Sequence, residues 1–421
     1  MGLKSLLLDN QSTKQTVFKN TFWLFVSRGI GFLDLLLIIF VARALGPTDY
    51  GSFSFAWSVV SIFAAIVVFG LPEIVTREFS RKEDLEKEFP SILSLRALLS
   101  LGAAVVMFGS SFLLTGDPQV RALIWLLAIY VLLRDFGGTL YAVFRARQKM
   151  EYEAWMQILL TVCSFVFVGL VLVFYPSIAN IGAGYLMGSL VALVGILVFF
   201  SLKIGALRIG WDREVWKKFF SFSWPLGLTA AFAAVYLFMD SVIMGVLGQT
   251  TQVGWYNAAY KIANITLIPM SIISISFYPV LSKYYEESGE SFQKFWTTFL
   301  KVMLVIATPL VLGVIIFAPQ IINLVYGEAY APSVPALRIL MVMVGLWFVS
   351  TPFIRALVIS NQQIKVLVLS ALGAFLNIIL NLVLIPRYSL SGAAVATAAT
   401  YFLILILAVI LVFKNRVLEP S

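Results

Sequence analysis

The sequence predicts an all-α polytopic membrane protein with twelve transmembrane helices in two six-helix bundles. Three observations predict this fold class. First, 61% of the 421 residues are hydrophobic and only 12% are charged, a balance typical of a membrane protein and not of a soluble domain. Second, the apolar residues form runs long enough to span a bilayer, which takes about 20 residues. Third, two short motifs of the first half recur in the second half.

The predicted spans follow one another with short connections, none of which is long enough to form a separate soluble domain. Their limits are residues 18–44, 51–74, 91–114, 120–144, 154–174, 178–201, 219–247, 253–281, 295–318, 335–360, 364–385 and 390–413. Of the 30 Lys and Arg residues, 20 fall on the side of the N-terminus, three on the opposite side (Arg43, Arg121 and Arg387), and seven within or at the ends of spans. Basic residues mark cytoplasmic loops. We therefore expect a multi-pass protein of the cytoplasmic (inner) membrane with both termini cytoplasmic.

Two pairs of similar segments indicate an internal repeat. LGPTDYG-SFSFA from Leu45 resembles LGQTTQVGWYNAA from Leu247 with one inserted residue, and PSIANIGA from Pro176 matches PRYSLSGA from Pro386. Each pair stands at an equivalent place in a six-span half, although glycine-rich turns can also resemble each other by chance. We predict an N-terminal bundle over residues 1–210 and a C-terminal bundle over residues 211–421. Because six is even, the two bundles keep one orientation and are related by a pseudo-two-fold axis along the membrane normal.

The residue inventory excludes several kinds of site. The chain has no histidine and a single cysteine, Cys163, which lies in an apolar run. These counts exclude histidine triads, histidine metal sites, disulfide frameworks and thiolate metal clusters. We therefore look for functional residues among the polar side chains inside the spans, because ionisable groups there usually face the bundle interior or a wet cavity.

Several ordered stretches resemble the Wzx-type polysaccharide-biosynthesis flippases of the multidrug/oligosaccharidyl-lipid/polysaccharide exporter superfamily. They are FKNTFWLFVSRGIGF, VARALGPTDYGSFSFA, MDSVIMGVLGQTTQVGWYNAAYKIANITLIPM and APQIINLVYGEAYAPSVPALRIL. The resemblance covers nearly the whole chain and implies two bundles around a central cavity with alternating access. It implies a transporter that moves a polyprenyl-diphosphate-linked oligosaccharide from the inner to the outer leaflet for surface polysaccharide synthesis. The partners it implies are this lipid, the bilayer and other polysaccharide-assembly membrane proteins, with no nucleic acid.

An anionic diphosphate needs cationic partners to cross hydrocarbon, and arginine can bind phosphate oxygens in bidentate fashion. We expect the substrate-binding residues to be Arg28, Arg77, Arg96, Arg134, Asn257 and Lys261. The alternatives are ion pairs of Arg28 with Asp34 and of Arg134 with Asp135, and extension of Arg96 to the headgroups. For Asn257, which shares a helix face with Lys261 and Asn264, the alternative is hydrogen bonding between helices.

Asp240 stands near the middle of an apolar span, where a charge costs about 2.5–3.5 kcal/mol. Asn377 and Asn381 share one face of the eleventh span, and Thr397 lies in a small-residue run of the twelfth. Their oxygens suit a hard cation such as Na⁺ better than a soft metal. Cation-coupled members of the superfamily place a site among the seventh, eleventh and twelfth spans. The resemblance therefore assigns Asp240, Asn377, Asn381 and Thr397 to a site for Na⁺ or H⁺, although Asn381 stands where such sites often have a second acid. A structural polar cluster is the alternative.

Two other functions stay open. A multidrug or small-lipid exporter of the same superfamily would have a smaller, more apolar and acidic site, which the basic residues within the spans disfavour. A membrane glycan polymerase or ligase usually needs a large outer loop, whereas the outer connections TGDPQV and YPSIA are short. Histidine is also missing for general-base catalysis. We therefore expect no enzyme, no catalytic residues and no cofactor other than a coupling ion.

Overall fold

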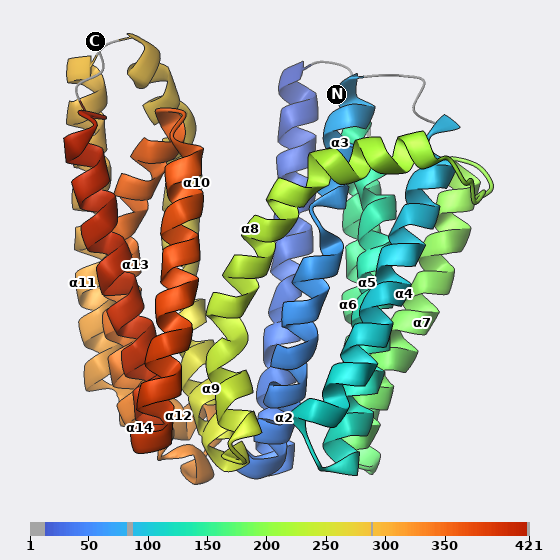
Figure 1. Ribbon diagram of the computed structural model, residues 1–421, viewed down its shortest axis with the longest axis horizontal. Helices are drawn as coiled ribbons and strands as arrows, with labels where there is room; N and C mark the ends of the chain where they lie inside the picture. Colours follow the sequence, from blue (N-terminus) through green and yellow to red (C-terminus); the bar gives the residue numbers. More distant parts are fainter. Residues whose placement is uncertain (1–12, 82–86, 288, 419–421) are drawn as a thin grey trace. The chain divides into compact units, whose positions relative to one another are not determined.

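The computed structural model describes residues 13–81, 87–287 and 289–418 (Figure 1). Within these ranges all regular secondary structure is helical, and ten helices are long and apolar enough to cross a membrane. Large apolar side chains face outward, among them Leu113, which is 88% exposed, and Phe25, which is 77% exposed. Contiguous exposed apolar surface of this kind is typical of lipid contact. The chain is therefore an all-α multi-pass membrane protein, as the sequence predicts.

The chain divides into two compact units. Unit 1 comprises Met1–Leu45 and Ala56–Ala231, and unit 2 comprises Gly46–Phe55 and Phe232–Ser421. Unit 1 contains most of α2 (Thr13–Val68), together with α3 (Leu71–Arg81), α4 (Phe89–Leu114), α5 (Pro118–Ala146), α6 (Met150–Phe174), α7 (Ile178–Lys203) and the beginning of α8 (Arg213–Val246). In this unit α7 packs against α5 and α6, and α4 packs against α5. Figure 1 shows α4 to α7 running side by side.

The starts of two unit 1 helices follow from local sequence. The carboxylate of Asp117 accepts a hydrogen bond from the amide of Gln119 at 2.8 Å, and Pro118 takes the first helical position of α5. The hydroxyl of Ser177 accepts a hydrogen bond from the amide of Asn180 at 3.2 Å, at the start of α7. These are standard ways to satisfy backbone donors that have no partner within the helix.

Two long helices each contain one sharp reversal. In α2 the reversal is at Gly46, which has φ 71° and is followed by Pro47. In α14 (Gln363–Lys414) it is at Ser389, which has φ 51° and ψ −129°. Glycine reaches positive φ without the steric cost that a Cβ imposes, while the Ser389 hydroxyl donates to Oε1 of Gln249 at 2.8 Å. Figure 1 shows α14 as two arms that meet at one end.

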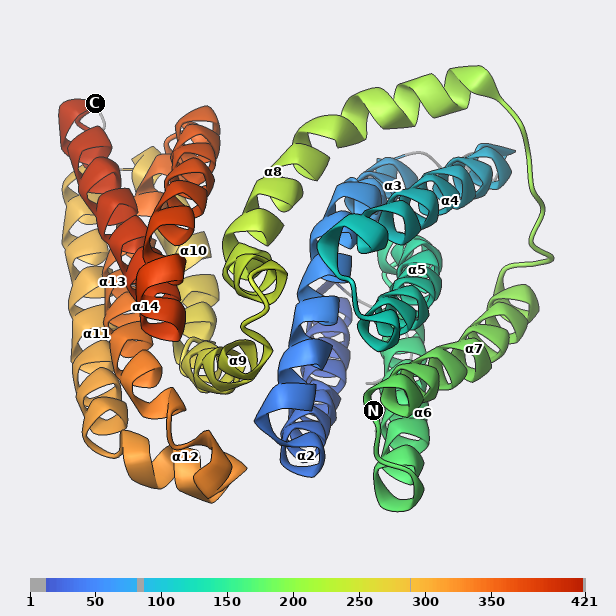
Figure 2. The same cartoon turned by 60° about the horizontal axis from the view of Figure 1, so that its bottom comes forward.

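Unit 2 contains the remainder of α8 together with α9 (Thr250–Ile265), α10 (Ile268–Glu287), α11 (Gly289–Ile316), α12 (Ala318–Tyr326), the short 3₁₀ helix η2 (Glu328–Tyr330), α13 (Ser333–Ile359) and α14. The central helix is α13, which packs against α9, α10, α11 and α14; Figure 2 shows α11, α13 and α14 next to one another. The predicted span 253–281 is interrupted, because α9 ends at Ile265 and α10 begins at Ile268. Pro269 explains the break, since it has no N–H for a continuous helix.

The two copies of the predicted glycine motif contact each other inside unit 2. A Cβ added to Gly51 would lie 1.7 Å from the carbonyl oxygen of Thr250. A Cβ added to Gly254 would lie 1.9 Å from the carbonyl oxygen of Pro47. Only glycine permits this approach of two backbones. The contacts are reciprocal, because each glycine faces the residue four positions before the other.

Candidate functional site

The candidate site surrounds the carboxylate of Asp240 on α8, a side chain that is 1% exposed. Thr397 Oγ1 donates to Asp240 Oδ2 at 2.7 Å, and Asn381 Nδ2 donates to Asp240 Oδ1. Asn381 Nδ2 also donates to Asn377 Oδ1 at 2.9 Å. The structure therefore brings together all four residues that the sequence assigns to the cation site.

The reversal divides α14 into two arms, and both arms lie beside the Asp240 carboxylate. Asn377 and Asn381 lie on the first arm, one turn apart, and Thr397 lies on the second. The arms approach closely because Gly392 follows the reversal: a Cβ there would lie 2.3 Å from the carbonyl oxygen of Leu384. Ala393, Ala394 and Ala396 of the same small-residue run are fully buried. Small residues at such a contact allow polar side chains on adjacent helices to reach one another.

A fifth member of the site, Tyr256 on α9, is missing from the sequence prediction. Its hydroxyl donates to Asp240 Oδ2 and lies 3.5 Å from Thr397 Oγ1. The Tyr256 ring stacks on Tyr260, with ring centroids 5.8 Å apart and an angle of 17° between the planes. Two tyrosines one turn apart in an apolar helix were the available signal, because a buried tyrosine hydroxyl usually needs a hydrogen-bond partner.

The site has the chemistry of an oxygen-rich, singly acidic centre. Three donors stabilise negative charge on the Asp240 carboxylate, and charge-assisted hydrogen bonds are the stronger class. Asn381 Oδ1 and Asn377 Nδ2 are buried and make no hydrogen bond within the described part of the chain. The described residues contain no group of three or more acidic, histidine or cysteine side chains that could hold a metal ion. A hard monovalent cation fits these ligands better than a transition metal.

The polar stripe on α9 is adjacent to this centre. Asn257 Nδ2 donates to Ser241 Oγ at 2.9 Å and to the carbonyl oxygen of Val253 at 2.9 Å. Ser241 follows Asp240 on α8, so this amide links the two helices in the way that the interhelical alternative predicts. Lys261, one turn further along α9, is half-buried.

The predicted basic residues of unit 1 include a buried cluster. Arg96 on α4 is fully buried, and its Nη2 lies 3.9 Å from Asp135 Oδ2 on α5. Arg134, whose side chain is 38% exposed, pairs with Asp135 Oδ1 at 3.1 Å. Two guanidinium groups therefore share one carboxylate. The expected alternative that Arg96 extends to the headgroups is wrong, because α5 covers its side chain and supplies the acid.

Arg77 and Asp34, the other predicted residues of unit 1 whose side chains the structure describes, are both exposed. Arg77 on α3 is 44% exposed and pairs with the adjacent Glu78 at 3.1 Å; its guanidinium also lies 5.4 Å from the centroid of the Phe222 ring. Asp34 on α2 is exposed. The side chain of Arg28, and with it the predicted pairing to Asp34, lies outside the described residues.

Solved structures show which fold the chain has. The chain aligns with the lipid II flippase MurJ in an inward closed conformation with a TM-score of 0.76 and 14% identity, covering 94% of this chain and 87% of that one. It aligns with an inward-facing multidrug resistance MATE family transporter of the MOP superfamily with a TM-score of 0.75 and 16% identity, covering 92% and 94%. The chain has the fold of this transporter superfamily.

Sequence comparisons define the family. The family model described as "Polysaccharide biosynthesis protein" matches residues 17–285. The probable low-salt glycan biosynthesis flippase Agl15 of Haloferax volcanii is 23% identical over 377 residues, which cover 88% of this chain and 77% of that protein. The putative O-antigen transporter of Escherichia coli is 21% identical over 421 residues, covering 97% and 99%. Because the family model matches more than half of the chain, this protein belongs to the polysaccharide biosynthesis protein family.

Proposed function

We propose that this protein is a secondary-active flippase that moves a polyprenyl-diphosphate-linked oligosaccharide from the inner to the outer leaflet for surface polysaccharide synthesis. The chain is a membrane transporter and not an enzyme. The observation that carries the choice of substrate is that two arginines, Arg96 and Arg134, lie at the carboxylate of Asp135. This arrangement places two guanidinium groups among the helices of a protein from a polysaccharide family. Of the groups in the substrate, the anionic diphosphate is the one that positively charged guanidinium groups stabilise.

In this proposal the six predicted residues bind the lipid-linked head. They are Arg28, Arg77, Arg96, Arg134, Asn257 and Lys261. Arginine supplies paired donors for phosphate oxygens, and Asn257 is suited to sugar hydroxyls because its amide both donates and accepts. The exposed part of Arg134 gives a phosphate access to the cluster, while Asp135 holds the guanidinium in place.

We also propose that the Asp240 centre couples transport to Na⁺ or H⁺. A bound cation would neutralise the negative charge on the Asp240 carboxylate, which three hydrogen-bond donors now stabilise. The hydroxyls of Thr397 and Tyr256 would then rotate, so that oxygen lone pairs and not protons face the centre. Loss of the hydrogen bond from Asn381 would loosen the link between α8 and α14. A cation that binds one arrangement more tightly shifts the population towards it.

We also propose the number of spans, their symmetry and their orientation in the membrane. Divided at Gly46 and Ser389, the ten apolar helices give twelve spans in two six-helix bundles, and both termini are cytoplasmic in the inner membrane. A pseudo-two-fold relation is supported inside unit 2, where Gly46 and Gly248 have φ 71° and 75°. The hydroxyls of Thr48 and Thr251 are 2.8 Å apart, which places the two motifs in contact. Other polysaccharide-assembly membrane proteins are the expected partners.

The test uses cells that lack this gene. Lipid-linked oligosaccharides of the cytoplasmic leaflet are quantified by mass spectrometry after rescue with the wild type, Asp240→Asn or Arg134→Gln. We expect accumulation that the wild type cures and both variants cure poorly. Matched controls are Glu286→Gln and Arg338→Gln, which remove one charge of the same sign from exposed positions.

The outcomes separate the parts of the proposal. If Asp240→Asn rescues as well as the wild type, the coupling site is wrong and the flippase function stands. If Arg134→Gln rescues fully, the arginine cluster does not bind the substrate. If no lipid-linked sugar accumulates in the deletion strain, the substrate is wrong, and export of drugs or small lipids becomes the better explanation.

A further inference from the structure

A cavity of about 210 Å³ lies within unit 2, between α8, α13 and both arms of α14. Its lining includes Ala233 and Tyr236 of α8, Trp347 of α13, and Ser370 and Tyr401 of α14. None of the described side chains that line it is charged. The volume far exceeds the roughly 10–15 Å³ that one water molecule requires, so the cavity has room for a small hydrated ion.

The cavity continues from the Asp240 centre along the same helices. Tyr236 precedes Asp240 by one turn on α8, and Tyr401 follows Thr397 by one turn on the second arm of α14. The lining residues of the first arm likewise precede its two asparagines. The reversal of α14 contacts Gln249, just after α8 ends, so all three displacements lead away from the reversal. They lead towards the end of unit 2 where α14 begins and ends (Figure 1), which is the cytoplasmic end in the proposed orientation.

Three aromatic rings form one wall of the cavity. The centroid of the Tyr401 ring lies 4.9 Å from that of Tyr236 and 4.7 Å from that of Trp347. The faces of aromatic rings attract cations, and tryptophan does so most strongly. The hydroxyls of the two tyrosines and of Ser370 can supply lone pairs in place of water. This wall therefore favours a small cation over an anion.

The charges near the cavity favour the same sign of ion. The Asp240 carboxylate stands one turn beyond the lining residues of α8. Two basic residues adjoin lining positions in the sequence, and both are engaged elsewhere. Arg355 Nε donates to Ser274 Oγ on α10 at 2.8 Å, and Lys365 Nζ donates to Asn415 Oδ1 at 2.6 Å. The described lining thus leads to an acid and contains no basic side chain.

We propose that the coupling cation reaches Asp240 from the cytoplasmic side through this cavity, and that the three aromatic rings bind it on the way. The inference rests on the cation coupling proposed for Asp240. At the end of the route, Asn381 Oδ1 is buried and makes no hydrogen bond within the described residues, so it offers an oxygen to the arriving cation. The lining contains none of the six residues proposed to bind the lipid-linked head, so the ion and the lipid do not have to share a path.

The experiment compares how fast a thiol in the cavity reacts with a cationic and with an anionic reagent. Cys163 is the single cysteine of the chain, so Cys163→Ser gives a thiol-free full-length background for Ala233→Cys. The purified protein in detergent is treated with trimethylammonioethyl or sulfonatoethyl methanethiosulfonate. Each rate is divided by the rate of the same reagent with mercaptoethanol, because the two reagents differ in intrinsic reactivity. The ratio of the two normalised rates then cancels the reactivity of the cavity thiol itself.

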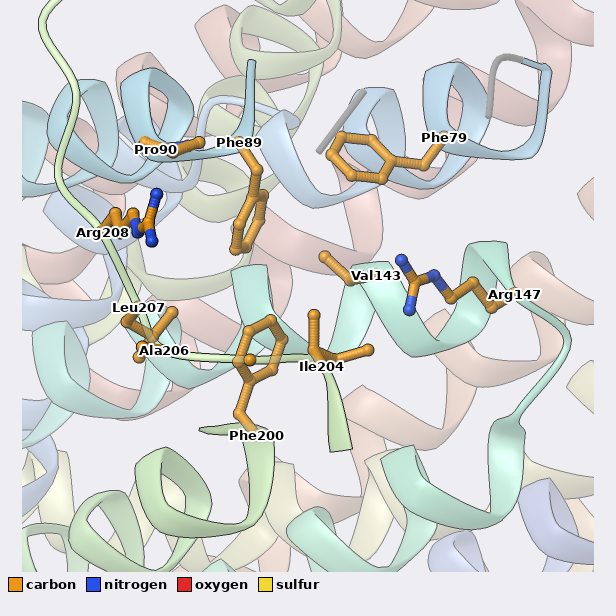
Figure 3. Close-up of a pocket in the computed structure, with 11 residues that line it drawn as sticks. Phe79, Phe89, Pro90, Val143, Arg147, Phe200, Ile204, Ala206, Leu207 and Arg208 are labelled. Atoms are coloured by element: carbon orange, nitrogen blue, oxygen red, sulfur yellow. The ribbon is translucent and has the colours of Figure 1, made fainter. Parts of the chain in front are cut away.

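We expect the cationic reagent to be favoured about 10-fold at Ala233→Cys, because the Asp240 carboxylate is about 10 Å further along α8. Adding Asp240→Asn should lower this ratio to about 1. The matched control is Ala206→Cys, which lines a cavity of about 140 Å³ in unit 1. Figure 3 shows Arg208 at that cavity beside core phenylalanines, and no acid is among its described lining residues. Its ratio should therefore be 1 or lower.

The side of access is tested in membranes, because both reagents are membrane-impermeant. Modification of Ala233→Cys should be much faster in inside-out vesicles than in intact cells, and equal rates would contradict access from the cytoplasmic side. The route is also overturned if neither reagent reacts, if the ratio is 1, or if the preference persists unchanged in Asp240→Asn. Failure of the coupling itself is seen separately, as full rescue of transport by Asp240→Asn. That result removes the route as well, whereas loss of the charge preference alone leaves the coupling intact.

Discussion

Tyr256→Phe tests the hydrogen bonding at Asp240 most directly, because it deletes one donor and little else. The Tyr256 side chain is 2% exposed, and phenylalanine can keep its stacking on Tyr260. A hydrogen bond to a charged group contributes about 1.5–3 kcal/mol in soluble proteins. Hydrogen bonds inside membrane proteins average about 0.6 kcal/mol, with a maximum near 1.7. For a donor to a buried carboxylate we expect a loss at the upper end of the membrane range, about 1.5 kcal/mol.

A double-mutant cycle with Asp240→Asn tests whether Tyr256 contributes to stability through its hydrogen bond to Asp240. In the Asp240→Asn background the lost hydrogen bond joins neutral groups, so Tyr256→Phe should cost only about 0.6 kcal/mol. The expected coupling energy is therefore about 1 kcal/mol, which exceeds the 0.3–0.5 kcal/mol by which independent sites usually depart from additivity. The assay is reversible unfolding in mixed micelles of fixed composition, with all variants titrated in parallel.

Tyr326→Phe is the matched control for this cycle. The Tyr326 hydroxyl is buried in unit 2 and makes no hydrogen bond within the described residues. Its removal should therefore leave stability unchanged or slightly increase it. A coupling energy below about 0.3 kcal/mol, or a Tyr326→Phe loss as large as that of Tyr256→Phe, would refute the reasoning that Tyr256 acts through the Asp240 carboxylate.

Two further changes test packing in each unit. Lys19 and Glu151 form an ion pair at 2.9 Å, with side chains that are 0% and 4% exposed; Glu151→Gln should cost about 3–5 kcal/mol by leaving a buried charge. Lys19→Met/Glu151→Leu should regain most of that stability in thermal unfolding, and a double variant no better than the single one would contradict this. Gly51→Ala would place a Cβ 1.7 Å from a facing carbonyl oxygen and should abolish a stable fold, measured by gel filtration in detergent. Gly313→Ala, which meets nothing within 4 Å, should be stable and gain up to about 1 kcal/mol of helix propensity.

The four polar residues around Asp240 could be grouped from the sequence because they are exceptions within apolar spans and because the family resemblance implies a site among the seventh, eleventh and twelfth spans. A carboxylate, two amides one turn apart and a threonine in a small-residue run stand out against their surroundings in the printed sequence. Tyr256 could not be found in this way, since tyrosine is common in apolar spans and its role depends on the rotation of α9. The same rotation turns Asn257 towards Ser241, which helix periodicity alone does not fix.

The buried arginine in α4 shows a different limit of sequence reasoning. Arg96 lies near the end of a predicted span, so headgroup contact and burial are equally compatible with its position. The outcome depends on Asp135, which is 39 positions later and belongs to a neighbouring helix. Periodicity identifies the faces of a helix, but the partner of a face is set by tertiary packing. The interruption between α9 and α10 is easier to predict from the sequence, because Pro269 marks it.

The energetics of Asp240 explain why a charge is tolerated inside the span, which is a separate question from the function of this residue. A charge at the centre of a span costs about 2.5–3.5 kcal/mol. Three hydrogen bonds at about 0.6–1.7 kcal/mol each contribute about 1.8–5 kcal/mol, a range that overlaps that cost. The three donors therefore offset much of the cost of the charge, and they hold α8, α9 and α14 together. In the proposed coupling, a cation competes with these donors, so its binding would change the contacts among the three helices. That competition would be the physical reason for a single acid to act as a switch.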